Sequence, residues 1–136
     1  MIVATSQLAP YQTRFSDGSH EGLSDTTADK GGAHAGFRPH DLLEAALANC
    51  VNMTVRMYAA HHAIPLSGVT TRVSLDRSHP DAVVFRYVVA FDGDLTPEQT
   101  QRLLRAAEAC PVRRTLSKRV QFECGGMGAA ITQTQA

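Results

Sequence analysis

The sequence predicts an α+β fold in which antiparallel strand pairs carry helices on one side. The first observation is a helix-compatible run over residues 39–62, rich in Ala, Leu and Met, which are strong helix formers. The second is a pair of strand-like runs at 68–75 and 82–91, the latter rich in β-branched and aromatic residues. The third is the order of these elements, in which strands and helices are segregated and no internal repeat occurs.

The region before the long helix predicts short strands at 2–7, 11–16 and 19–24. Asp17-Gly18 is a strong turn dipeptide between the last two, so we expect an N-terminal hairpin. Residues 25–38 hold several glycines and few apolar side chains, which is typical of a loop.

We expect the run 39–62 to form a buried helix. Pro39 suits a first helical position, and Pro65 stops the pattern. Apolar side chains recur at steps of three and four and also cover most other positions, and a helix that is apolar on nearly every side is a buried one. Cys50 is therefore expected in or beside the core. Because one chain offers few strands to enclose this helix, we expect a homodimer in which both sheets cover the two long helices.

The C-terminal third predicts two helices and a last strand. Thr96 is a candidate N-cap, with Gln99 as its reciprocal capping-box partner. Pro111 breaks this helix at Cys110 and starts a second helix over 112–118. We expect a short strand at 120–124.

Length and composition favour a single small domain, which we place at residues 1–124, followed by a flexible tail over 125–136. The net charge is zero, with 19% charged residues, which argues against nucleic-acid binding by bulk electrostatics. The sequence has no apolar run of the ~20 residues that a membrane span requires, and no secretory signal is expected. Three cysteines, an odd number, favour free thiols in a reducing compartment, which we take to be the cytoplasm.

Two cysteines carry the candidate chemistry. Cys50 and Cys110 are 60 positions apart without CxxC spacing, which argues against a zinc knuckle or a thioredoxin-type pair. Cys110 precedes a helix start, where unpaired N–H groups favour a thiolate, and Arg113 and Arg114 add positive charge. Cys50 lies in mid-helix, so its activation needs a cation and hydrogen bonds from other segments. The alternative is that both are small buried apolar residues, which is how we interpret Cys124.

The six histidines do not predict a metal site. They form no HxxxH or HExxH pattern, and we interpret most of them as surface or capping residues. No metal or organic cofactor is expected. The histidines are His20, His34, His40, His61, His62 and His79.

The chain resembles the OsmC/Ohr family, the osmotically inducible protein C and organic hydroperoxide resistance proteins. The run GFRPHDLLEAALANCVNMTVRMYA at 36–59 resembles the first signature of this family, and AEACPVRRTLS at 107–117 resembles the second. The upstream run DGSHEGLSDTTADKGGAHAG is similar to the general OsmC-like branch. The resemblance covers roughly residues 11–124. It implies an OsmC-like fold, with antiparallel sheets around a long central helix in an intertwined homodimer.

The resemblance also implies a thiol-dependent peroxidase. Cys50 would be the peroxidatic nucleophile that attacks an organic hydroperoxide and becomes a sulfenic acid, and Cys110 would resolve it as a Cys50–Cys110 disulfide. Expected partners are a second copy of the chain, an alkyl or fatty-acid hydroperoxide and an external dithiol reductant, without nucleic acid or membrane. The expected role is defence against oxidative stress.

Two positions depart from the peroxidase pattern. His40 stands where the characterised peroxidases have Glu, and the acidic residue follows at Asp41. Arg14 is the nearest candidate for the arginine that activates the thiolate, with Arg38 and Arg56 as alternatives. A second hypothesis is therefore a non-enzymatic protein of this fold that binds a small apolar ligand or acts as a redox sensor.

Overall fold

A computed structural model of the chain describes residues 1–128. The chain divides into two compact units, one comprising Met1–Pro39 with the segment from Arg119 onward, and the other His40–Lys118. The single-domain assignment for residues 1–124 stays a prediction, and residues 129–136 of the expected flexible tail lie outside the described part.

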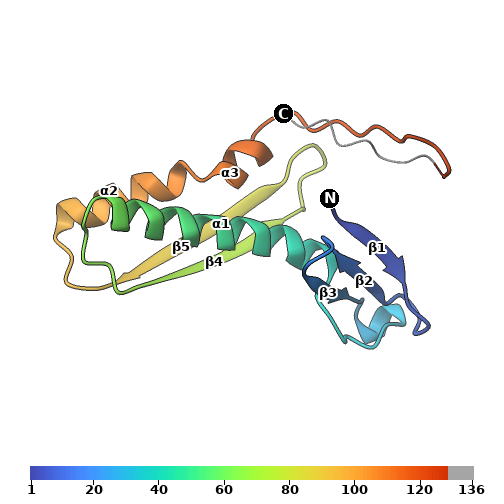
Figure 1. The fold of residues 1–136 in the computed structure, drawn as a ribbon. Coiled ribbons are helices and arrows are strands. Elements are labelled where there is room, and N and C mark those ends of the chain that lie inside the picture. The colour runs from blue at the N-terminus through green and yellow to red at the C-terminus, as the bar shows by residue number, and fades with distance from the viewer. Residues whose placement is uncertain (129–136) are drawn as a thin grey trace. The chain divides into compact units, whose positions relative to one another are not determined.

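The first unit contains a three-stranded antiparallel sheet formed by β1 (Val3–Ser6), β2 (Thr13–Ser16) and β3 (Glu21–Ser24), in that order (Figure 1). The predicted strands and the hairpin are confirmed. Asp17 makes the β2–β3 turn, because its Oδ1 accepts hydrogen bonds from the backbone N–H groups of Ser19 at 2.8 Å and His20 at 2.7 Å.

The loop that follows β3 is organised by the buried carboxylate of Asp25, which is 2% exposed. Its oxygens accept hydrogen bonds from the backbone N–H groups of Thr26, Ala33 and Ala35 at 2.7, 3.2 and 3.0 Å. The hydrogen bond from Ala35 is the largest influence, and together these bonds keep the pKa of Asp25 below its usual value although burial opposes them. The predicted loop contains one short 3-10 turn, η1 (Ala28–Lys30), between the residues that bond to Asp25.

The second unit is a two-stranded antiparallel hairpin with three helices: α1 (Pro39–His61), β4 (Gly68–Asp76), β5 (Val84–Asp92), α2 (Pro97–Glu108) and α3 (Pro111–Leu116). The hairpin register runs from Gly68 opposite Asp92 to Asp76 opposite Val84. Alternate side chains face the helices and pack against the core: Val69, Val73, Phe85, Tyr87, Val89 and Phe91. The predicted α+β class with antiparallel sheets is confirmed.

Helix α1 is the centre of this core, but it is buried along one stripe only in the single chain. Leu47, Val51, Val55 and Ala59 follow at steps of four and are at most 3% exposed. Met53 and Met57, on the other side, are 59% and 72% exposed, and Leu43, which precedes the stripe by one turn, is 44% exposed. The expected burial on every side is therefore absent in the single chain, because one hairpin and two short helices cover one face. A dimer that covers the other face stays a prediction.

Two polar contacts fix α1 to the hairpin. The Asn52 side-chain amide donates to the carbonyl oxygen of Val69 at 2.7 Å, and Glu44 accepts from the backbone N–H of Leu75 at 2.7 Å. Both satisfy strand groups that no neighbouring strand pairs, which sets the position of α1 along β4.

The C-terminal helices follow the predicted boundaries. Thr96 and Gln99 form the expected capping box, with Gln99 N–H donating to Thr96 at 3.2 Å and Thr96 N–H to Gln99 at 2.9 Å. Pro111 ends the run after α2 and begins α3, with Cys110 at the N-cap position.

The strand predicted at 120–124 is wrong for the single chain. These residues form no strand, and Phe122 is 94% exposed. The sequence pattern is apolar enough for a strand, but a strand also needs an edge to pair with, and none of the described strands pairs with this segment. Within residues 1–128, no helix combines the length and apolar character that crossing a bilayer requires.

Candidate active site: the Cys50–Cys110 pair

The second unit brings Cys50 and Cys110 together. Cys50 lies in the middle of α1 and is half-buried, whereas Cys110 lies between α2 and α3 and is fully buried. Cys50 packs against the apolar cluster that contains Cys110, the Cys110 thiol lowers the pKa of Cys50, and both thiols are free. Two residues 60 positions apart are thus direct neighbours within one chain.

Pro111 explains how the chain delivers hydrogen-bond donors to this pair. It ends the run of α2 and sets the first turn of α3, whose leading backbone N–H groups have no partner within the helix. The N–H of Val112 reaches the Cys50 sulfur, and the N–H groups of Arg113 and Val112 reach that of Cys110. A short break between two helices therefore surrounds both sulfurs with main-chain donors.

The two thiols have opposite pKa shifts. Burial raises the pKa of Cys50, but hydrogen bonds from Cys110, Val112 and Thr54 outweigh it and bring the pKa below its ordinary value. Burial also raises the pKa of Cys110, and the two N–H groups beside it do not compensate, since the neighbouring Cys50 sulfur raises it further. Cys50 is therefore the thiol that loses its proton first, while Cys110 stays protonated and donates to it.

Thr54 has two possible acceptors on Cys50. Its hydroxyl donates to the Cys50 carbonyl oxygen at 2.7 Å, one helical turn back. The same hydroxyl also stabilises the Cys50 thiolate. Because a hydroxyl has a single proton, it serves one acceptor at a time. In this structure the hydroxyl donates to the carbonyl, and donation to the sulfur instead would favour the thiolate.

No charged side chain contributes to the pKa shift of Cys50 within the described residues. Arg14, the expected activator, lies on β2 in the first unit and pairs with Glu21 at 3.2 Å, with both side chains exposed. Arg56 is exposed on α1, and Arg38 belongs to the first unit. Of the three, only Arg56 belongs to the second unit with Cys50, and it is not among the groups that shift the pKa of Cys50.

His40 and Asp41 lie in the first turn of α1. His40 is ten residues before Cys50 on the same helix, which separates the two by roughly 15 Å along the axis at 1.5 Å per residue. His40 is exposed and Asp41 is half-buried. Within one chain, neither residue reaches the cysteine pair.

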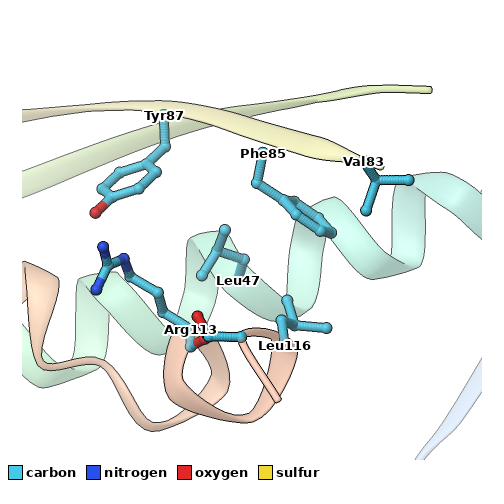
Figure 2. Close-up of a pocket in the computed structure, with 7 residues that line it drawn as sticks. Leu47, Val83, Phe85, Tyr87, Arg113 and Leu116 are labelled. Atoms are coloured by element: carbon cyan, nitrogen blue, oxygen red, sulfur yellow. The ribbon is translucent and has the colours of Figure 1, made fainter. Parts of the chain in front are cut away.

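A pocket of about 280 Å³ opens beside the pair in the second unit. Leu47 on α1 forms its floor, and this residue precedes Cys50 by one helical turn on the same side of the helix. Figure 2 shows side chains from β5 on one side and from α3 on the other. The lining residues are Leu47, Val83, Phe85, Tyr87, Arg113, Leu116 and Ser117.

Sequence reasoning found both cysteines but missed Thr54 and Tyr87. The signal for Thr54 was available, because a hydroxyl four residues after Cys50 on a helix lies on the same face. No sequence signal could have found Tyr87, since a half-buried strand aromatic is ordinary core material until α3 is placed opposite it. Among the described residues, no group of three or more His, Cys, Asp or Glu side chains is arranged to hold a metal ion.

Comparisons with known proteins agree with this geometry. The family model for OsmC-like protein matches residues 30–125. No curated protein matches the chain.

Solved structures share the fold. The OsmC-like protein of Mycoplasma pneumoniae is 16% identical with a TM-score of 0.73, covering 85% of each chain. The organic hydroperoxide resistance protein OhrB of Bacillus subtilis is 24% identical with a TM-score of 0.62, covering 86% of this chain and 89% of its own. The organic hydroperoxide resistance protein OsmC of Legionella pneumophila is 20% identical with a TM-score of 0.62, covering 86% and 88%. Because the family model matches most of the chain, this chain belongs to the OsmC-like family.

Proposed function

We propose that this protein is a thiol-dependent peroxidase that reduces organic hydroperoxides in defence against oxidative stress. The single observation that supports it most is that Cys50 packs against the cluster that contains Cys110, which places a thiol of lowered pKa beside a buried thiol of raised pKa. The family membership, and the hydroperoxide resistance named for two of the structural relatives, agree with this function.

The proposed reaction begins at Cys50. Its thiolate attacks the distal oxygen of the hydroperoxide, the O–O bond breaks, and the alkoxide leaves and takes up a proton as the alcohol. Cys50 becomes a sulfenic acid. The N–H of Val112 and the hydroxyl of Thr54 are the donors that stabilise the thiolate before attack.

Cys110 then completes the oxidation half of the cycle. Its sulfur attacks the Cys50 sulfenic acid, water leaves, and a Cys50–Cys110 disulfide forms. An external dithiol reduces this disulfide by exchange and is itself oxidised. No metal or organic cofactor takes part, and a reducing compartment such as the cytoplasm suits the cycle because it supplies the dithiol.

A thiol count tests this function. One equivalent of cumene hydroperoxide should remove two of the three thiols rapidly and leave Cys124, and Cys50→Ser should abolish the loss. A loss no faster than the rate of free thiols in buffer would exclude the peroxidase. Cys110→Ser should leave a sulfenic acid on Cys50 that dimedone labels, and an unlabelled Cys50 would contradict the order of the two cysteines.

One observation favours a second function. All groups that lower the pKa of Cys50 within the described residues are neutral donors, and no guanidinium is among them. Such a thiol suits slow redox sensing, or a protein that binds an apolar ligand without turnover. The two functions differ in rate: a sensor would form the same disulfide, but without multiple turnovers when dithiol is in excess.

A further inference from the structure

A cluster of basic and aromatic side chains lies where the C-terminal end of α1 runs beside α2 (Figure 1). The Arg102 Nε–H donates to the Tyr58 hydroxyl at 3.2 Å, and the Arg102 Cζ lies 5.7 Å from the centre of the Tyr58 ring. The ring centre of His62 is 4.2 Å from that of Tyr58, and that of His61 is 5.0 Å from that of His62. We call these four residues the Tyr58 cluster, in which one phenol ring joins a guanidinium to two imidazoles.

The main chain at the end of α1 holds both histidines in place. The N–H of His62 donates to the Tyr58 carbonyl oxygen at 3.1 Å, and the N–H of Ile64 donates to the Ala59 carbonyl oxygen at 2.9 Å. Ala63, between them, has a positive φ of 50°, the left-handed conformation that commonly ends a helix. Because backbone groups bond these carbonyls, the two imidazoles are not needed as caps and remain available to a ligand.

The positive charge of the cluster has no protein counter-ion among residues 1–128. No Asp or Glu side chain there lies within ion-pairing distance of Arg102, His61 or His62. Desolvation lowers the pKa of His62, the charges of Arg102 and His61 lower it further, and no carboxylate acts in the other direction. Like charges that repel one another in this way are stabilised by an added anion.

The cluster also retains hydrogen-bond donors. Of the Arg102 nitrogens, Nε has its acceptor in the Tyr58 hydroxyl, so the terminal N–H groups of the guanidinium keep their donors for a ligand. The Tyr58 oxygen accepts that bond and retains its own proton as a further donor. A half-buried guanidinium held by a neutral phenol is therefore oriented without losing its charge.

We propose that the Tyr58 cluster binds a phosphate-type dianion, held by the terminal N–H groups of Arg102 and by the imidazole N–H of His62. The planar guanidinium presents parallel N–H groups that match two oxygens of such an ion, and a dianion gains from both cations at once. The ion is free phosphate or the phosphate group of a small monoester, because both present the same oxygens. This site goes beyond the proposed peroxidase function, since His62 follows Cys50 by twelve residues, or roughly 18 Å along α1.

The proton on His62 makes this site sensitive to pH. The groups that face His62 are Tyr58 and His61 on α1 and Arg102 on α2. Without an anion the pKa of His62 is lowered, so its imidazole is mostly neutral near neutral pH. A bound dianion favours the imidazolium and raises that pKa, so by linkage its affinity rises as the pH falls. Sulfate is the probe for this dependence, because it stays a dianion where a phosphate monoester gains a proton at about pH 6.

The test is titration of the full chain with sodium sulfate or sodium phosphate, followed by NMR of the histidine imidazole signals. Arg102→Gln should weaken sulfate about tenfold, and Arg102→Lys less, because Lys keeps the charge but not the fork. Arg56→Gln is the matched control, since it removes the same charge from an exposed position on the other side of α1 and should change affinity less than about twofold. Wild type should bind sulfate about tenfold more tightly at about pH 5.5 than at about pH 8, and His62→Gln should remove most of this difference.

Several results would overturn the site. These are unshifted His62 signals at tens of millimolar sulfate, equal affinity in wild type and Arg102→Gln, an equal loss in Arg56→Gln, or the same shifts with sodium chloride at equal ionic strength, which would indicate screening alone. Glycerol phosphate distinguishes the two sources of the ion. Binding as tight as that of inorganic phosphate would uphold the site for monoesters, and binding of inorganic phosphate alone would uphold it for the free ion.

Discussion

Cys50 and Cys110 are neighbours in space, but different interactions set the pKa of each thiol. Cys50 sits within a continuous helix, where the main chain offers its sulfur no donor of its own, so its donors come from Thr54 one turn on and from α3. Cys110 sits at a helix break in a fully buried position, where burial outweighs the two main-chain N–H groups beside it. A thiol in the interior of a helix is thus the more acidic one, which reverses the expectation that helix starts favour thiolates.

The difference shows that a helix start helps a thiolate only as much as its surroundings permit. At Cys110, desolvation and the adjacent sulfur both oppose the charge. At Cys50, the same short break supplies a donor across the gap, so the N–H groups of α3 benefit the thiol on the other helix. Placing the break beside α1 creates one nucleophile and one proton donor from two chemically identical side chains.

The largest expected effect comes from a substitution that removes apolar packing in the cluster that buries Cys110. Leu103 is fully buried on α2 in the same apolar cluster, so Leu103→Ala should cost about 2–5 kcal/mol of unfolding free energy. Leu104→Ala, at a neighbouring position that is 43% exposed, is the control and should cost under about 1 kcal/mol. Urea denaturation measures both. Similar losses for the two variants would show that α2 does not hold Cys110 by burial.

The pH dependence of alkylation sharpens the comparison next. Because only thiolates react, the rate for Cys50 should rise with a midpoint below the ordinary thiol pKa, and that for Cys110 with a midpoint above it. At pH 7, Cys50 should react faster than Cys110, because a larger fraction of it is thiolate. Iodoacetamide labelling with mass spectrometry follows both thiols in one sample, with exposed Cys124 as the internal reference. A lower midpoint for Cys110 would reverse the assigned roles.

Removing the hydroxyl of Thr54 should reduce the difference between the pKa values of Cys50 and Cys110. Thr54→Val keeps the shape of the side chain but loses the hydroxyl, so the pKa of Cys50 should rise, and Thr54→Ser should restore it. The alkylation profile provides the measurement. An unchanged Cys50 midpoint in Thr54→Val would mean that the hydroxyl serves the Cys50 carbonyl alone.

The smallest expected effect concerns the hydrogen bond that positions α1 on the hairpin. Asn52→Ala removes the hydrogen bond to the Val69 carbonyl and should cost about 1 kcal/mol of stability. Asn49→Ala is the matched control, because the Asn49 amide bonds only to the Ala45 carbonyl of its own helix at an exposed position. Thermal unfolding of both variants distinguishes them. Equal melting temperatures would show that the Asn52 hydrogen bond does not stabilise the packing of α1 on the hairpin.

Much of the architecture could be predicted from local sequence. The limits of α1 follow from Pro39 and Pro65, and the start of α2 follows from Thr96 and Gln99, because caps and prolines act within a few residues. The hairpin of β4 and β5 follows from alternation along the first strand and from the β-branched and aromatic composition of the second. The segment 120–124 shows the limit of this reasoning, since its pattern is strand-like but strand formation depends on an available edge.

The sequence by itself determined the elements, the family signatures and the two cysteines, because periodicity, capping and motif spacing are properties of neighbouring residues. Only the tertiary structure decided which sulfur is the more acidic, since desolvation and hydrogen bonds between distant segments set that order. The same holds for the pocket, where Tyr87 and Arg113 meet only because α3 folds opposite β5. Chemistry that depends on the distance between residues far apart in the chain cannot be read from the order in which they occur.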